Sequence, residues 1–166
     1  MMEGKKAKPR AILVFGAPCS GKTTFAKKFA EKYDLAYFNL EEVQSQYNFD
    51  HAEVLTVLEL IAKTHHTLVI EGCIGTENER QDLKKLLVGA GYEVALVWVQ
   101  TDVATIRSRM KIKYKSVTKA KSVYDASINE LEAPTELEKP IILSGKHTFE
   151  TQAKHVIAGL ADADRR

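Results

Sequence analysis

Residues 11 to 30 read AILVFGAPCSGKTTFAKKFA, and this stretch decides the fold. The apolar run Ile12–Phe15 is typical of a short strand that is buried on both faces. Over the last part of the stretch, Phe25 and Phe29 stand four residues apart, a spacing that places them on one face of a helix. The stretch therefore predicts a strand, a glycine-containing loop and a helix, in that order.

The loop itself, residues 16–23, reads GAPCSGKT and matches the phosphate-binding pattern G-x-x-x-x-G-K-[ST]. Unpaired N–H groups at a helix N-terminus carry partial positive charge, and a loop wrapped before the helix aims more of them at one anion. Lys22 can reach the terminal phosphates, and the hydroxyl of Thr23 can bind Mg²⁺. We therefore expect ATP and Mg²⁺ as ligands, with the nucleotide held by Gly16, Ala17, Pro18, Cys19, Ser20, Gly21, Lys22, Thr23 and Thr24.

Cys19 stands inside this loop at a position where glycine is common. Glycine adopts a positive φ without strain, whereas any other residue type is strained there. If the loop requires a positive φ at this position, the cysteine costs about 1 kcal/mol.

The rest of the chain alternates between strand and helix patterns. Strands are predicted at 35–39, 67–70, 94–99 and 141–143, and helices at 52–63, 78–90, after Thr101-Asp102, and around 149–160. This alternation predicts an α/β fold, a parallel sheet with helices on both faces. Ligands of such sheets bind at the carboxyl ends of the strands. Besides the loop, that rule nominates Glu41 and Glu42, Glu71–Thr76, Thr101 and Asp102, and Ser144–Thr148.

Length and composition narrow the class of protein. A chain of 166 residues predicts one domain, here over residues 11–166, after a flexible, polar and basic tail at residues 1–10. The net charge of +2 gives no general argument for nucleic-acid binding. The apolar run after the tail is too short for a signal peptide or a membrane span. We expect a monomeric cytoplasmic protein, and the two cysteines do not suggest a disulfide framework.

Missing motifs argue against several classes of phosphate-loop protein. The chain has no Asn-Lys-x-Asp segment, which argues against a guanine-specific GTPase. No apolar run ends in Asp-Glu, as it does in motor-type ATPases. Leu143-Ser144-Gly145 lacks the Gly-Gln that the signature of a transporter ATPase would add.

The chain resembles the small phosphate-loop kinases, most of all the group of polynucleotide 5′-hydroxyl kinases and zeta-toxin-like kinases. Three stretches carry the resemblance: ILVFGAPCSGKTTFAKKFAEKY, LVIEGCIGTENERQDLKKLLVGAGYEVALVWVQTDVATIRSRM and ELEAPTELEKPIIL. It implies the three-layer P-loop kinase fold, with a five-stranded parallel sheet and a mobile helical lid that bears arginines. It also implies transfer of the γ-phosphoryl group of Mg-ATP to an acceptor hydroxyl or phosphate.

The resemblance carries over to particular acidic residues. The acidic residue after the second strand orients or deprotonates the acceptor; here it is Glu41, with Glu42 as the alternative. The family more often has Asp at this place and an arginine three residues on, where this chain has Gln44. Such an arginine would bind an acceptor phosphate, so its absence leaves the acceptor class open. Glu71 closes the third strand, and together with Thr23 it is expected to place Mg²⁺.

A basic run falls where the lid of such a kinase belongs, about residues 107–124. Positive groups there can offset the charge that spreads over the γ-phosphoryl oxygens during transfer. Arg109 matches the first lid arginine best, and Arg107 and Lys113 are the alternatives. The run from residue 103 to 124 contains no acidic residue, and its cations are Arg107, Arg109, Lys111, Lys113, Lys115, Lys119 and Lys121.

The primary hypothesis is an ATP-dependent kinase in which Lys22, Glu41 and Arg109 are catalytic. Its partners are ATP and an acceptor, which is a polynucleotide 5′-hydroxyl, a nucleotide or a small metabolite such as a sugar. A second hypothesis is a nucleotide-binding switch with little or no acceptor-dependent turnover. A third is a nucleic-acid-binding module that uses the basic run, whose affinity should fall steeply with salt.

Overall fold

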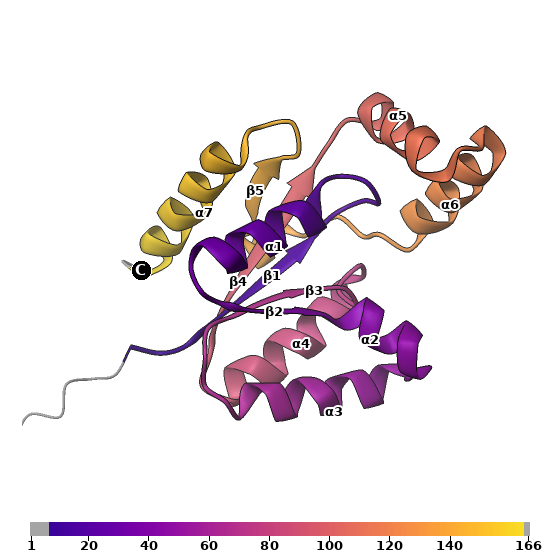
Figure 1. Cartoon of the computed structure of the whole chain (residues 1–166). Coiled ribbons are helices and arrows are strands. Elements are labelled where there is room, and N and C mark those ends of the chain that lie inside the picture. Colours follow the sequence, from indigo (N-terminus) through magenta and orange to yellow (C-terminus); the bar gives the residue numbers. More distant parts are fainter. Residues whose placement is uncertain (1–6, 165–166) are drawn as a thin grey trace, which may run out of the picture.

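The computed structural model describes residues 7–164 and shows one sheet of five parallel strands (Figure 1). The strand order is β2-β3-β1-β4-β5, so the strand that leads into the phosphate loop is central. Each strand lies within two residues of the position that the sequence predicts, because short apolar runs between turns mark buried parallel strands clearly. The strands are β1 (Arg10–Phe15), β2 (Ala36–Asn39), β3 (Leu68–Glu71), β4 (Glu93–Gln100) and β5 (Ile141–Ser144).

Helices cover both faces of the sheet and make the three expected layers (Figure 1). Side chains of β1 alternate between two cores, because successive residues of a strand point to opposite faces. Ile12 and Val14 pack with α1 (Lys22–Lys32) and α7 (Phe149–Asp164). Leu13 and Phe15 pack on the other side, in a core that also takes residues from α3 (His51–Ala62) and α4 (Glu77–Gly89).

Two helices were not predicted from the sequence. The helix α2 (Leu40–Tyr47) follows β2 directly, capped by Asn39, whose side chain accepts hydrogen bonds from the N–H groups of Glu41 and Glu42. Only Leu40 of this helix is buried, so the sequence carries no apolar periodicity there. The helix α6 (Val117–Asn129) is separated from α5 (Val103–Tyr114) by Lys115, which has a φ of 51°.

The segment expected to form the lid folds as a pair of helices, α5 and α6, that projects from the sheet after β4, and we call this pair the lid (Figure 1). It extends from residue 103 to 129, beyond the expected range of about 107–124. Asp102 caps α5 by accepting a hydrogen bond from the N–H of Thr105. The second helix was missed because it buries only Ala120 and Tyr124, too few residues to give a helical pattern.

The N-terminal tail is shorter than expected. Arg10 already belongs to β1, and the carbonyl oxygen of Pro9 accepts a hydrogen bond from the N–H of Glu93. The remainder of the expected tail at residues 1–6 lies outside the described residues. Within residues 7–164, no helix has the length and apolar character needed to cross a membrane.

Candidate functional site

The phosphate loop joins β1 to α1 at the centre of the sheet's carboxyl edge. Gly21 is the N-cap of α1 with a φ of 102°, and no side chain in the described part of the chain caps this helix. Its first N–H groups therefore remain available to an anion. Gly16 is required for a different reason, because a Cβ atom there would overlap the carbonyl oxygen of Val99 in β4.

Glu71 is the most buried carboxylate at this edge, with only 1% of the residue exposed. Its Oε1 accepts hydrogen bonds from the Thr23 hydroxyl at 2.8 Å, from the Tyr37 hydroxyl at 2.9 Å and from Asn39 Nδ2 at 2.9 Å. Burial and the neighbouring Glu71 carboxylate raise the pKa of Tyr37 well above its usual range, so this phenol stays a donor. Tyr37 and Asn39 were not singled out from the sequence. Their place at the carboxyl end of β2, where ligands of parallel sheets bind, would have nominated them.

The other carboxylate oxygen of Glu71 makes the site suitable for a cation. Oε2 is buried and has no hydrogen-bond partner among the described residues. A buried oxygen without a partner is costly unless a ligand satisfies it. Carboxylate and hydroxyl oxygens are the ligands that Mg²⁺ uses beside phosphates. Thr23 and Glu71 therefore fit the expected magnesium site, directly or through bound water.

One cleft against the loop has a volume of about 500 Å³, and we call it the Lys22 cleft. Glu41 lines it and Glu42 does not, a distinction that the sequence left open. Gly72 accounts for the position of Glu41: its φ is 83°, and a Cβ there would overlap the backbone nitrogen of Glu41. The polar and charged residues that line the cleft come from the loop, α2, the segment after β3, α4 and the end of α6. They include Lys22, Glu41, Gln44, Thr76, Glu79 and Glu130.

A second pocket of about 420 Å³ lies against other residues of the same loop, and we call it the Arg109 pocket. Loop residues Cys19 and Gly21 line it, together with Thr24 of α1, Arg109 of α5 and Gly145 after β5. None of its described lining residues also lines the Lys22 cleft. Different residues of the phosphate loop thus line the Lys22 cleft and the Arg109 pocket.

Arg109 ties the lid to the loop through backbone oxygens. Its Nη1 donates to the carbonyl oxygen of Cys19 at 3.1 Å and to that of Ser20 at 3.3 Å. Its Nη2 donates to the carbonyl oxygen of Gly145 at 3.1 Å. Of the three lid cations singled out in the sequence, Arg109 is the one that contacts the loop.

The two alternative cations contact other parts of the lid. The guanidinium carbon of Arg107 lies 5.8 Å from the ring centre of Tyr124 in α6. The Nζ of Lys113 lies 5.4 Å from the ring centre of Tyr114. These cation–π contacts place both side chains against lid aromatics. Neither residue is among the described residues that line the Lys22 cleft or the Arg109 pocket.

The lid also packs on the loop with its own small core. This core is formed by Ile106, Met110, Ala120 and Tyr124, and Ala17 and Cys19 of the loop pack against it. Cys19 has a φ of 58°, the left-handed conformation anticipated from its place in the motif. The loop therefore holds a strained residue whose side chain contacts the lid.

Replacing Cys19 by glycine is expected to relieve this strain. Because a left-handed conformation costs a residue with a Cβ about 1 kcal/mol more than glycine, Cys19→Gly should be about 1 kcal/mol more stable than Cys19→Ala. The alanine variant is the matched control, since it also loses the sulfur but keeps the strain. Urea unfolding of both variants measures the difference. Equal free energies of unfolding would show that the loop relaxes around position 19.

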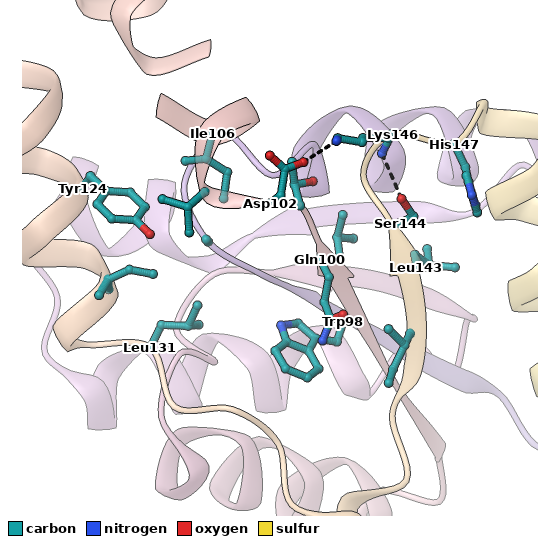
Figure 2. A pocket seen from close by; sticks show the side chains of 16 residues that line it. Trp98, Gln100, Asp102, Ile106, Tyr124, Leu131, Leu143, Ser144, Lys146 and His147 are labelled. Carbon is teal, nitrogen blue, oxygen red and sulfur yellow. Dashed lines mark hydrogen bonds and ion pairs between the residues drawn. The ribbon is translucent and has the colours of Figure 1, made fainter. Parts of the chain in front are cut away.

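A larger cavity, about 750 Å³, lies elsewhere, between the lid and the ends of β4 and β5. Figure 2 shows Trp98, Tyr124 and Leu131 around it, with Asp102 and Lys146 paired at its polar end. The ion pair with Lys146 holds the pKa of Asp102 well below its usual range. Of the loop only Ala17 is among the described residues that line this cavity, and Lys22 and Glu71 are not. Size alone therefore does not identify the phosphate site.

Arg80 of α4 holds a segment between α6 and β5, residues 131–138, whose first residue, Leu131, lines the Lys22 cleft. Arg80 is 2% exposed, and it donates to Glu138 through Nε at 2.6 Å and through Nη2 at 3.1 Å. Its Nη1 donates to the carbonyl oxygens of Gly75 at 2.9 Å and Glu132 at 3.0 Å. We call residues 131–138 the Arg80 strap.

Sequence reasoning missed Arg80, although a signal was present. Arg80 stands three residues before Leu83 and seven before Leu87, the two apolar residues that α4 buries. A cation at that spacing lies on the apolar face of the helix. Buried charges need partners, so such an arginine predicts an acidic partner from elsewhere in the chain. Glu138 is that partner.

The ion pair predicts acid-sensitive stability. The Arg80 guanidinium holds the pKa of Glu138 below its ordinary value of 4.5. A lowered pKa in the folded state contributes stability that is present above the unfolded pKa and is lost as the pH falls through the folded pKa. Between about pH 5 and about pH 3 the wild type should lose more unfolding free energy than Glu138→Gln does. Equal losses of unfolding free energy in the wild type and in Glu138→Gln, measured by denaturant unfolding, would contradict this prediction.

The comparisons with known proteins agree with this fold. A family model described as an AAA domain matches residues 12–137. A gluconokinase from Sinorhizobium meliloti 1021 superposes with a TM-score of 0.69 at 16% identity, over 95% of each chain. The APS kinase CysC of Mycobacterium tuberculosis, in complex with AMPPNP and APS, gives 0.69 at 17%, over 94% of this chain and 99% of that one. Kti12 of Chaetomium thermophilum, with ADP-AlF3, gives 0.70 at 17%, over 92% and 98%.

A search of curated proteins found no sequence relative. At identities below 20% the solved structures establish the fold, which is that of the P-loop kinases. The function must be argued from the site itself.

Proposed function

The chain belongs to the AAA domain family, and from this premise we propose that it is an ATP-dependent kinase that transfers the γ-phosphoryl group of Mg-ATP to an acceptor hydroxyl. One observation carries the proposal: Cys19 and Gly21 of the phosphate loop line one pocket, and Lys22 at the end of the same loop lines a separate cleft. A nucleotide and an acceptor can then meet at the loop from different sides. A nucleotide-binding switch needs only a nucleotide site. Because the Lys22 cleft offers a second site for an acceptor, it favours the kinase.

The Arg109 pocket is the proposed site of the nucleoside end of ATP. Its lining includes the start of α1 and two residues after β5, Gly145 and His147, which fall in the segment nominated by the rule on the carboxyl ends of strands. Arg109 holds the lid against this pocket through the carbonyl oxygens of Cys19, Ser20 and Gly145. Its proposed role is thus to fix the lid and the loop around the nucleotide. Two neighbours were solved with nucleotides, AMPPNP with the APS kinase and ADP-AlF3 with Kti12.

Transfer is proposed to occur where the loop meets the Lys22 cleft. The acceptor oxygen forms a bond to the γ-phosphorus, the bond from that phosphorus to the β–γ bridging oxygen breaks, and ADP leaves. Glu41 orients the acceptor hydroxyl and takes its proton. Lys22 and the N–H groups of the loop stabilise the negative charge on the transferring group and on ADP. Bound Mg²⁺, held near Thr23 and Glu71, would supply further charge neutralisation.

The test is acceptor-dependent ADP release from the purified protein with Mg-ATP. The panel covers the candidate acceptor classes: 5′-hydroxyl oligonucleotides, nucleotides and sugars. Stimulation by one class that is lost in Lys22→Ala supports a kinase and identifies its acceptor class. ATP binding without stimulation by any member would point instead to the switch.

A further inference from the structure

The charges that line the Lys22 cleft restrict the acceptor. Lys22 is the single cation among the described residues that line it, and it is proposed to bind the phosphates of ATP. Three carboxylates face it: Glu41, Glu79 and Glu130. An anionic acceptor would therefore approach three like charges with no cation left to pair with, and buried or enclosed charges need partners.

The three glutamates come from separate segments of the chain and line the same cleft. Glu41 lies in the first turn of α2, Glu79 lies in the first turn of α4, and Glu130 is the C-cap of α6. A Cβ atom at Gly75 would lie 3.1 Å from the carbonyl oxygen of Glu130 and 3.7 Å from Oε2 of Glu79. Two electronegative groups, one from α4 and one from the lid, thus meet at Gly75.

The polar lining of the cleft also includes a neutral amide from α2. Gln44, where the resemblance would have an arginine, is a neutral amide that accepts a hydrogen bond from Cys73 Sγ at 3.5 Å.

We propose that the acceptor is a small hydroxyl compound that carries a protonated amine, such as an amino sugar or an amino alcohol. Its ammonium group lies beside Gly75, near the carboxylate of Glu79 and the carbonyl oxygen of Glu130, and its hydroxyl lies near Glu41 and Lys22. This inference rests on the proposed function, since it assigns the Lys22 cleft to the acceptor. It disfavours sugar acids, nucleotides and polynucleotide ends, which all bring negative charge into the cleft.

The experiment uses probes matched in skeleton and different in charge. One set is glucosamine, glucose and glucuronate; another is 2-aminoethanol, ethylene glycol and glycolate; a 5′-hydroxyl oligonucleotide is added. Binding is measured by calorimetry to protein loaded with AMPPNP and Mg²⁺, and ADP release is measured separately with Mg-ATP. We expect the amine to bind at least about tenfold more tightly than the carboxylate of its set, with a preference that weakens as salt is added.

Variants test whether the named carboxylates cause the preference. Glu79→Gln and Glu130→Gln should each lower the ratio of amine to carboxylate binding, and Gln44→Arg should lower it further. Glu136→Gln is the control, because Glu136 is exposed and lies outside the described lining of the cleft. Glutamine at position 79 retains the oxygen that accepts from the N–H of Thr76, so the start of α4 keeps its cap.

The possible results separate the two proposals. Equal or tighter binding of the carboxylates or the oligonucleotide overturns the inference, and so does undetectable binding of both amines. An amine preference without any ADP release that depends on Lys22 overturns the kinase and leaves the charge selectivity of the cleft standing. ADP release stimulated most by an anionic acceptor supports the kinase and overturns the amine.

Discussion

Lys22→Ala is expected to reduce ADP release by about 100- to 1000-fold, the size of effect seen when one positioned donor to a developing negative charge is removed. Lys22 begins α1 at the end of the phosphate loop, and it also lines the cleft proposed for the acceptor. Its ammonium is thus placed to stabilise charge on the phosphoryl group as it moves between the two sites. The readout is kcat/KM for ADP formation with Mg-ATP, beside the Kd for ATP.

The matched control is Lys32→Ala, an exposed lysine in the last turn of the same helix. Both variants remove one positive charge from α1, so a general effect of charge would appear in both. Lys32→Ala should retain wild-type kinetics. If Lys22→Ala keeps its rate within about threefold of the wild type, the loop does not use this lysine in transfer, and the kinase proposal fails.

Arg80→Met is expected to lower the free energy of unfolding by about 3–5 kcal/mol, since it leaves the partner of a buried ion pair unpaired. Arg80 is nearly inaccessible, and its loss also removes donors from the carbonyl oxygens of Gly75 and Glu132. Its guanidinium carbon lies 4.9 Å from the ring centre of Phe15, so packing on the central strand is lost as well. Urea unfolding followed by circular dichroism measures the effect.

Two further variants isolate the cause. Lys85→Met removes a cation from the exposed side of the same helix and should change stability by less than about 0.5 kcal/mol. Arg80→Met combined with Glu138→Met removes both charges, and it should be more stable than Arg80→Met alone. A double variant no more stable than the single one would show that the ion pair is not the source of the loss.

The sequence determined the class of fold and one half of the site, because those features depend on local patterns. A buried strand, a glycine loop and a helix within residues 11–30 are enough to specify the anion site at the start of α1. Alternating strand and helix patterns then specify the parallel sheet, since parallel strands need crossover helices. Glu71 was nominated as a site residue in the same way, because it is a carboxylate at the end of a predicted strand.

Only the tertiary structure decided which side chains surround the loop, because those contacts join segments far apart in the chain. It placed Glu41 in the Lys22 cleft through the close approach of Gly72 to α2. It turned Arg109 onto backbone oxygens of the loop rather than toward the cleft. Arg80 and Glu138 are 58 residues apart in sequence, and no local pattern specifies such a pair. The charge of the Lys22 cleft likewise comes from glutamates of three separate segments, which only packing brings together.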